Sequence, residues 1–288
     1  YDLFSRAPWL GSLIDPRAAG GDLVEHGFDD LEPLLAQVMA KAETAELAEM
    51  AVAAQGLAKA AEILAGRFTL VATNVPYLGR GKQDGVLKDY CERHHSDAKA
   101  DLATCFVERC LASCAEGGST ALVTPQNWLF LGTYKELRKR LLEEAQWEAV
   151  ARLGPRAFET IGGEVVNVAL LALSRRQAED AHSFAGWDAS GRATPGQKDA
   201  ALLGDTARVV IQADQVGNPD ARITFDAPSA LPLLGTCAGA YQGLTSGDNP
   251  KFMQMFWEQQ VLGKAWEPTQ SASNDGPWSS GRELILRW

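Results

Sequence analysis

No hydrophobic stretch in this 288-residue sequence approaches the roughly 20 consecutive apolar residues that a membrane-spanning helix needs. The first residues also lack the basic and apolar segments of a secretory signal peptide. Cysteine is scarce: there are five, an odd number without paired spacing, so no disulfide framework is expected. These absences favour a cytoplasmic protein with reduced thiols and no membrane partner.

Positive charge is also in short supply, with 27 Lys and Arg against 37 Asp and Glu and a formal net charge of −10. Nucleic-acid binding relies on basic side chains that contact phosphates, so this balance argues against strong DNA binding by the chain alone. Any basic surface must therefore be local, or belong to a part of the protein outside this sequence. Apolar residues, in contrast, make up 46% of the chain, which is enough for a large buried core.

The most informative stretch is residues 68–79, FTLVATNVPYLG. Its β-forming residues end at Asn74 and a turn with Pro76 follows, which predicts a buried strand with a polar residue at its carboxyl end. Sheets of alternating strands and helices usually build their sites at the carboxyl ends of strands. The same residues also suit an ordinary turn, in which the asparagine caps, the proline stiffens and the Tyr77 ring packs.

The sequence after this stretch alternates between helical and strand patterns. Helices are predicted over 101–116 and 133–144, and buried strands over 119–125, 147–153 and 165–174. This order, ending in a hairpin, fits the second half of a doubly wound α/β sheet. Residues 28–65 are rich in Ala, Glu and Leu and predict a helical segment before the sheet.

Cys91, His94 and His95 together suggest a zinc site, because these residue types bind zinc. Two further cysteines fall at helical spacing with apolar residues, on one predicted face: Leu102, Phe106, Cys110 and Cys114. Free cysteine on a buried face behaves as a small hydrophobic residue, so no metal site is predicted.

Asn74-Val75-Pro76-Tyr77 resembles the Asn-Pro-Pro-Tyr motif of methyltransferases that act on adenine N6 in DNA. Three further segments strengthen the comparison: DLATCFVER (101–109), TPQNWLFL (124–131) and LGPRAFETIGGEVVNVALLAL (153–173). Taken together, residues 68–175 resemble the PglX-type adenine-specific methyltransferases of phage-exclusion (BREX) systems and related type II enzymes. The resemblance implies a Rossmann-like catalytic domain, S-adenosylmethionine as methyl donor, duplex DNA as substrate and other phage-defence subunits as partners.

The resemblance makes Asn74, Val75, Pro76 and Tyr77 the catalytic residues. The Asn74 side-chain oxygen and the carbonyl of Val75 would accept the N–H groups of the adenine amine, which favours a pyramidal, nucleophilic nitrogen. The Tyr77 ring offers a face on which the flipped base can stack. The family has proline where this chain has Val75. A valine still supplies the carbonyl and stays extended before Pro76, but its φ is not fixed, which predicts a slower site or an inactive one.

Further contacts to DNA follow from the same resemblance. Phe158 lies where related enzymes place an aromatic ring against the flipped base. A basic glycine loop and residues 241–249, which resemble the opening of a target-recognition domain, supply the remaining candidates: Arg80, Lys82, Gly247 and Asn249. The tryptophans that follow are expected to pack mostly in a small core.

Asp15-Pro16, with Gly20-Gly21 after it, superficially resembles the glycine loop that binds S-adenosylmethionine. That loop requires further strands before the catalytic motif, and residues 28–65 provide none. The cofactor-binding residues are therefore unknown, and this chain alone is expected to methylate poorly or not at all.

We therefore predict four segments: a helical amino-terminal segment (1–66), part of a catalytic core (67–177), an irregular connector (178–235) with one short strand at 208–211, and the start of a target-recognition domain (236–288). Two other functions remain open. One is a protein-glutamine N5-methyltransferase, which uses the same tetrapeptide on an amide nitrogen. The other is a catalytically decayed scaffold that only docks to protein or DNA. The helical insert and the carboxyl-terminal tail favour a DNA adenine methyltransferase of restriction-modification or phage defence.

Overall fold

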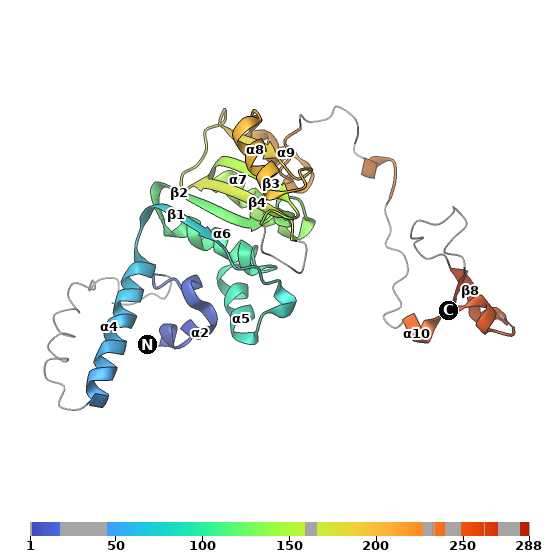
Figure 1. Ribbon diagram of the computed structural model, residues 1–288, viewed down its shortest axis with the longest axis horizontal. Coiled ribbons are helices and arrows are strands. Elements are labelled where there is room, and N and C mark those ends of the chain that lie inside the picture. The colour runs from blue at the N-terminus through green and yellow to red at the C-terminus, as the bar shows by residue number, and fades with distance from the viewer. Residues whose placement is uncertain are drawn as a thin grey trace. The chain divides into compact units, whose positions relative to one another are not determined.

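The computed structural model describes residues 2–17, 45–158, 166–226, 232, 234–239, 249–261, 263–269 and 283–287. The chain divides into two compact units, Tyr1–Pro228 and Ser229–Trp288 (Figure 1). Within the described ranges, no helix has both the length and the apolar character needed to cross a membrane.

The first unit contains a six-stranded sheet made of β1 (Phe68–Asn74), β2 (Cys114–Pro125), β3 (Gln146–Gly154), β4 (Val168–Ser174), β5 (Ser183–Asp188) and β6 (Arg208–Ile211). The strand order is β1-β2-β4-β3-β5-β6. Strands β1 and β2 are parallel, as are β3 and β5, whereas β4 is antiparallel to β2 and β3, and β6 is antiparallel to β5. The predicted α/β fold class is confirmed, including the hairpin that β3 and β4 form.

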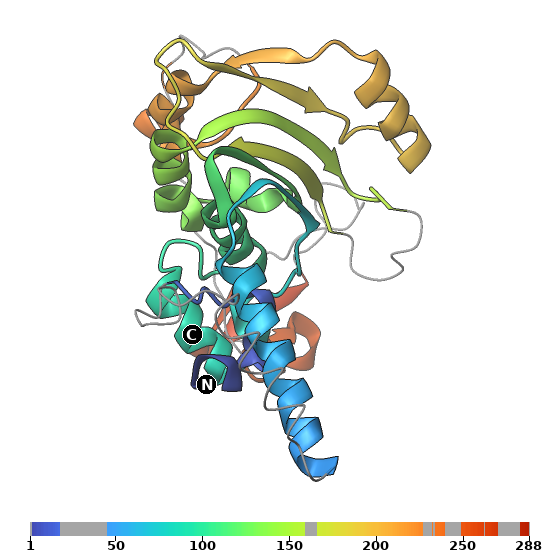
Figure 2. The same cartoon turned by 90° about the vertical axis from the view of Figure 1, so that its left-hand side faces the viewer.

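The helices of this unit are α1 (Asp2–Ser5), α2 (Ala7–Leu10), α4 (Ala45–Ala65), α5 (Gly85–His94), α6 (Leu102–Ser113), α7 (Lys135–Glu144), α8 (Pro195–Gly204) and α9 (Gln212–Gly217). Short 3₁₀ turns are η1 (Gly11–Leu13), η2 (Arg80–Lys82), η3 (Gln126–Leu129), η4 (Gly132–Tyr134) and η5 (Pro219–Ala221). Helices α5 and α6 join β1 to β2, which is the crossover that parallel strands require. The long helix α4 extends away from the sheet (Figures 1 and 2).

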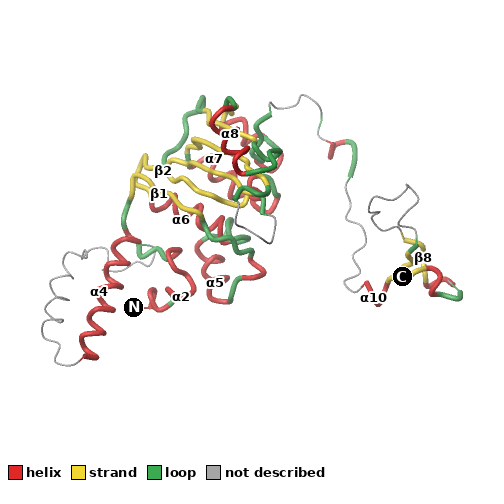
Figure 3. The backbone as a smooth tube through the Cα atoms, viewed as in Figure 1, coloured by secondary structure: helices red, strands yellow, loops and turns green. Residues whose placement is uncertain are grey.

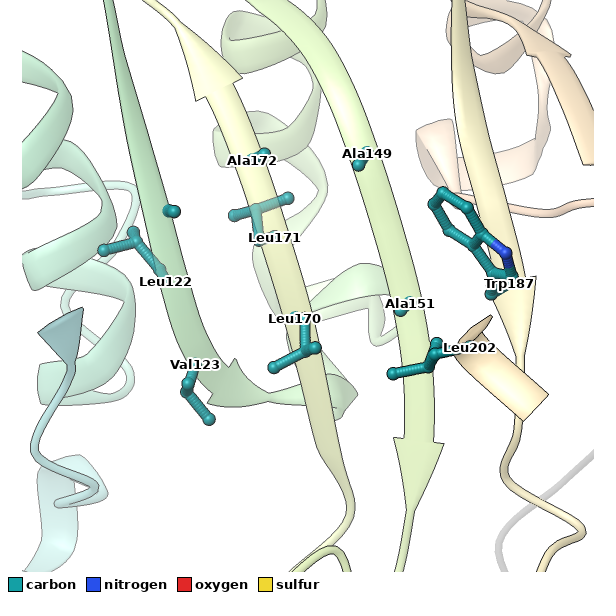
Figure 4. Close-up of a pocket in the computed structure, with 10 residues that line it drawn as sticks. Leu122, Val123, Ala149, Ala151, Leu170, Leu171, Ala172, Trp187 and Leu202 are labelled. Atoms are coloured by element: carbon teal, nitrogen blue, oxygen red, sulfur yellow. The ribbon is translucent and has the colours of Figure 1, made fainter. Parts of the chain in front are cut away.

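Helices α6 and α7 cover one face of the sheet. Alternate residues of β4, Ala169, Leu171 and Leu173, belong to the large core on this side, together with the fully buried Trp128 and Trp147. The opposite face carries a small cluster beside α8 and an open apolar hollow of about 380 Å³ (Figure 4). Residues that line this hollow include Ala121, Val123, Ala151, Leu170, Trp187 and Leu202.

The helix predicted over 101–116 ends at Ser113, because β2 begins at Cys114. Cys114 pairs with Phe68 of β1, and the strand register then shifts. Gly118 fits this irregularity, since a Cβ there would lie 2.7 Å from the Phe68 carbonyl oxygen. Gly117 and Gly118, which directly follow the predicted helix, therefore lie within β2 and not at a helix end.

The prediction that residues 68–74 form a buried strand is wrong in its burial. Among the described residues, β1 lies at one edge of the sheet and pairs with β2 alone. Leu70 is 60% exposed and Phe68 is 40% exposed, while Val71 is half-buried against the core. The β-forming residues predict a strand but not its neighbours, so they cannot tell an edge strand from a central one.

The irregular connector predicted over 178–235 is corrected in part: its one predicted strand, residues 208–211, is observed as β6, but the segment also contains β5 and α8, and residues 183–211 extend the sheet. Strand β5 pairs in parallel with β3, and β6 pairs with β5. Phe184 is buried in the core, and Gly186 leaves room for Phe225, whose ring would lie 2.8 Å from a Cβ at position 186. The Gly-, Ala- and Asp-rich composition concealed β5, because this strand is short and buries few large side chains.

The second unit contains α10 (Asn249–Phe252), β7 (Met253–Met255), β8 (Trp266–Thr269) and β9 (Leu284–Arg287), with 3₁₀ turns η6 (Leu234–Thr236), η7 (Phe256–Glu258) and η8 (Gly263–Ala265). Its strands form an antiparallel sheet in the order β7-β9-β8 (Figure 3). Trp257 is 60% exposed, so the expectation of a tryptophan core is wrong for this residue. Trp278 and Trp288 lie outside the described residues.

Candidate active site

The tetrapeptide begins at the carboxyl end of the edge strand β1. Asn74 is the last residue of the strand and is exposed, and Pro76 is exposed as well. Between them, the Val75 side chain is buried in the core with 3% exposure, and its N–H donates to the Val123 carbonyl oxygen of β2 (3.3 Å). The main chain at residue 75 is therefore held from both its side chain and its N–H.

Tyr77 is half-buried against the core, and its hydroxyl group is buried without a hydrogen-bond partner among the described residues. Burial and the negative charge of Asp101 raise the pKa of Tyr77 to about 12. Because of this pKa, the phenol stays protonated at neutral pH and does not act as a base. The geometry leaves the ring itself as the part of Tyr77 that could contact a ligand.

The segment after Tyr77 is fixed to the start of α6. The Asp101 carboxylate accepts a hydrogen bond from the Leu78 N–H (3.3 Å) and caps α6 by accepting another from the Ala103 N–H (2.9 Å). The Leu102 N–H in turn donates to the Leu78 carbonyl oxygen (3.0 Å), and the Gln83 side chain donates to the same oxygen (3.0 Å).

The two basic residues proposed to contact DNA lie in η2, beside this segment. The Arg80 guanidinium forms an ion pair with Glu92 (2.6 Å), and Lys99 contacts the same carboxylate. Lys82 is exposed. Arg80 would therefore have to exchange its partner for a phosphate, and the DNA contacts of both residues stay predictions.

Phe158 follows β3, whose carboxyl end lies at the same edge of the sheet as that of β1, because β4 is antiparallel to both β2 and β3. With strands spaced by about 4.8 Å, the ends of β1 and β3 are roughly 14 Å apart. Phe158 is 38% exposed. The Gln126 side chain accepts a hydrogen bond from the Gly154 N–H (3.2 Å), which ties the end of β2 to the end of β3.

A hollow of about 600 Å³ lies beside Asn74, between β1, α6, the end of α4 and the amino-terminal turns. The sequence did not reveal this hollow. It predicted Leu102 and Phe106 as a buried helical face, but both line the hollow, and Phe106 is only partly buried. Their helical spacing was the available signal, and it cannot tell a core face from a face that lines a cavity.

Asp15, the acidic residue of the rejected cofactor loop, has structural partners. Burial tends to raise its pKa, but hydrogen bonds from Arg17 and the positive charge of Arg109 outweigh this and lower it below the ordinary value. Arg17 also donates to three main-chain carbonyl oxygens, on Ala65, Gly66 and Ala112. Gly20 and Gly21 lie outside the described residues, and no cofactor-binding residue is assigned.

The cysteines and histidines after the tetrapeptide have structural contacts of their own. Cys91, Cys105, Cys110 and Cys114 are buried, and His95 Nδ1 lies 2.6 Å from the Glu108 carboxylate. Within the described part of the chain, no three His, Cys, Asp or Glu side chains are arranged to bind a metal ion.

The remaining site predictions fall in the second unit. Asn249 is the first residue of α10, and Gly247 lies outside the described residues. Their proposed role in recognising DNA stays a prediction.

Comparison with known proteins relates the chain to a methylase family. Residues 24–158 match the family model described as Eco57I restriction-modification methylase. The adenine-specific methyltransferase PglX of Lacticaseibacillus casei (strain Zhang) is 33% identical over 127 residues, which are 43% of this chain and 10% of that protein. The adenine-specific methyltransferase BrxX of Escherichia coli O9:H4 (strain HS) is 33% identical over 166 residues, which are 57% of this chain and 13% of that protein.

Similar solved structures include the type ISP restriction-modification enzyme LlaGI, with 13% identity and a TM-score of 0.41 over 60% of this chain and 19% of that one. A type I methyltransferase subunit from Streptococcus thermophilus has 17% identity and a TM-score of 0.39 over 54% of this chain and 37% of that one. The resemblance predicted from the sequence is confirmed by the family model and the curated relatives: the chain is similar to a segment of PglX-type adenine-specific methyltransferases, about a tenth of their length.

Proposed function

We propose that this chain is a segment of a DNA adenine N6-methyltransferase that transfers a methyl group from S-adenosylmethionine to a flipped-out adenine. One observation carries the proposal: the exposed Asn74 side chain lies at the carboxyl end of β1, directly before the main-chain carbonyl of Val75. Residues 24–158, which include this tetrapeptide, match the methylase family model, and the chain is similar to two adenine-specific methyltransferases.

The chemistry needs two hydrogen-bond acceptors and no strong base. The adenine amine is a poor nucleophile because its lone pair is delocalised into the ring. Acceptance of its two N–H groups by Asn74 and the Val75 carbonyl favours the pyramidal nitrogen of the transition state. The position of residue 75 is held by its buried side chain and its hydrogen bond to β2, so the acceptor is preorganised without a proline.

The hollow beside Asn74 is large enough for the methyl donor. Its volume, about 600 Å³, falls within the range of small-molecule sites. Phe106 and Leu102 give it an apolar wall, and Asn74 and Pro76 place it next to the tetrapeptide. When bound, S-adenosylmethionine supplies an electrophilic methyl group on its sulfonium. Asn74 and the Val75 carbonyl would orient the adenine nitrogen toward this methyl group.

The carboxyl edge of the sheet would receive the base. Tyr77 and Phe158 offer rings at this edge, and an extruded base is commonly held between aromatic side chains. Duplex DNA as substrate, contacts from Arg80 and Lys82, assembly with other phage-defence subunits and action in the cytoplasm complete the proposal.

The test is methyl transfer by the intact protein of which this chain is a segment. Tritiated S-adenosylmethionine is offered with unmodified duplex DNA, and label in DNA and in protein is counted separately. We expect label in DNA, and a loss of at least a hundredfold for Asn74→Ala. Thr69→Ala, an exposed change on the same strand, serves as the matched control. Label in glutamine side chains would support the protein methyltransferase, and no label in either pool would support the scaffold.

A further inference from the structure

Asp101 makes the link between the tetrapeptide and the helix behind it. One carboxylate oxygen, Oδ1, accepts both the Leu78 N–H (3.3 Å) and the Ala103 N–H (2.9 Å). The first of these groups is one residue beyond Tyr77, and the second is in the first turn of α6. A single side chain therefore fixes the position of residue 78 relative to α6.

The main chain around this contact is also paired. Gly79 and Asp101 form an isolated antiparallel bridge. The Leu102 N–H donates to the Leu78 carbonyl oxygen (3.0 Å), and the Arg80 N–H donates to the Ala100 carbonyl oxygen (2.9 Å). The Leu78 N–H, in contrast, donates to a side chain, and this contact with Asp101 lies directly after the tetrapeptide.

The tetrapeptide is thus held at both ends. At its start, the Val75 N–H is bonded to Val123 of β2 (3.3 Å); just past its end, the Leu78 N–H is bonded to Asp101. The direction of the Val75 carbonyl depends on the dihedral angles between these two points. A proline at residue 75 would fix φ, whereas valine leaves it free. The contact between Asp101 and the Leu78 N–H therefore restricts the main chain where the residue type at position 75 does not.

We infer that Asp101 is a positioning residue for methyl transfer, which holds Leu78 so that the Val75 carbonyl and the Tyr77 ring keep their orientation toward the acceptor base. This inference rests on the proposed function. Asp101 acts through the main chain and does not itself touch the substrate.

The competing explanation is that Asp101 serves α6 as a helix cap and nothing more. Three variants separate the two roles. Asp101→Asn keeps an acceptor oxygen in place for both N–H groups. Asp101→Ser remains a good cap for Ala103, but its shorter side chain does not reach Leu78. Asp101→Ala loses both contacts.

The kinetic test compares these variants in the intact protein. If Asp101 positions the tetrapeptide, kcat for methyl transfer falls at least tenfold in Asp101→Ser and Asp101→Ala, while KM for duplex DNA changes less than threefold. Asp101→Asn should stay within threefold of the unsubstituted protein. A helix-capping role alone predicts that Asp101→Ser is as active as Asp101→Asn, and that result would overturn the inference.

The second readout needs no activity and uses the 288-residue chain. Hydrogen exchange of the Leu78 amide, followed by NMR, should accelerate at least tenfold in Asp101→Ser and Asp101→Ala but not in Asp101→Asn. If the unsubstituted intact protein methylates nothing, the proposed function fails, and this exchange pattern alone decides whether Asp101 holds the segment. Unchanged exchange in Asp101→Ser contradicts the inference whatever the activity.

Discussion

At the scale of single residues, Val75 lacks the fixed φ of a proline but makes two contacts that hold the main chain, one through its side chain and one through its N–H. Val75 is buried, and its N–H is bonded to Val123, a bond that a proline could not make. The family residue would fix φ at this position but would leave the Val123 carbonyl without this donor. The two solutions hold the same carbonyl by different means.

This exchange predicts a small effect for Val75→Pro. We expect the methylation rate of the intact protein to change less than about fivefold, since one net hydrogen bond contributes about 1 kcal/mol and the fixed φ offsets part of its loss. Single-turnover methyl transfer measures the change. A gain of a hundredfold or more would show instead that valine marks a decayed site.

Two tyrosines near Asp101 predict a dependence of stability on alkaline pH. Burial and the charge of Asp101 raise the pKa of both Tyr77 and Tyr134 to about 12. In the unfolded chain these phenols ionise near pH 10, so the folded state favours the neutral form. Their contribution to stability is complete below pH 10 and is lost as pH rises toward 12.

Urea unfolding between pH 8 and 12 measures this effect. The free energy of unfolding should fall above pH 10, and the fall should be smaller in Tyr134→Phe, which cannot ionise there. Tyr241→Phe, in the second unit, serves as the control for the loss of a tyrosine elsewhere. An equal slope for Tyr134→Phe and the unsubstituted chain would contradict the role of this phenol.

At the scale of elements, Arg138 of α7 holds the loop that follows β2. Its side chain is fully buried and donates to the main-chain carbonyl oxygens of Trp128, Leu131, Asp220 and Ala221. These carbonyls belong to η3, η5 and the segment before η4, so one guanidinium joins three turns to a helix.

Replacing Arg138 should therefore be costly. We expect Arg138→Met to lower the free energy of unfolding by about 3 kcal/mol, because it leaves buried carbonyl groups without donors. Arg138→Lys should recover only part, since an ammonium lacks the planar fork of a guanidinium. Lys139→Met, next to it but partly exposed, is the matched control. Chemical denaturation checks the series, and equal midpoints for the Arg138 and Lys139 variants would be the contrary result.

The sequence predicted best those strands whose residues are almost all apolar, because such a run indicates burial directly. Residues 165–174 are almost wholly apolar, and the strand observed there, Val168–Ser174, is buried along one face and partly buried along the other. Pattern could not place β1 at an edge, because the exposure of Leu70 depends on which strands lie beside it. It also missed β5, where Phe184 is the one large side chain in the core and Gly186 works by leaving space.

The candidate site divides in the same way. The tetrapeptide could be singled out because its residue types resemble a known catalytic motif, and its catalytic role stays a prediction. The contact of Asp101 with Leu78 could not, because residues 78 and 101 are brought together by the helix and turn between them. The hollow beside Asn74 was hidden because Phe106 has the spacing of a core residue.

At the scale of the whole molecule, the residues that the structure describes leave one face of the sheet partly uncovered. The apolar hollow over β2, β4 and β3 has a volume of about 380 Å³ and includes the exposed Ala121 (Figure 4). Sheets with parallel strands are usually covered on both faces. An open apolar face of this kind gives the isolated chain a surface on which apolar molecules can bind.

Binding of the fluorescent dye anilinonaphthalene sulfonate measures this surface. We expect the isolated chain to bind the dye, and Ala121→Glu to reduce the fluorescence at least threefold while the melting temperature changes little. Ala193→Glu, an exposed change away from the hollow, should leave dye binding unchanged. Equal fluorescence in the two variants would place the dye elsewhere.

The identity of the methylated atom tests the account most directly. The intact protein, with S-adenosylmethionine and unmodified duplex DNA, is followed by digestion of the DNA to nucleosides and mass spectrometry. The account predicts N6-methyldeoxyadenosine as the product, and its loss in Asn74→Ala but not in Thr69→Ala. Another methylated nucleoside, methylation of protein alone, or full activity of Asn74→Ala would contradict it.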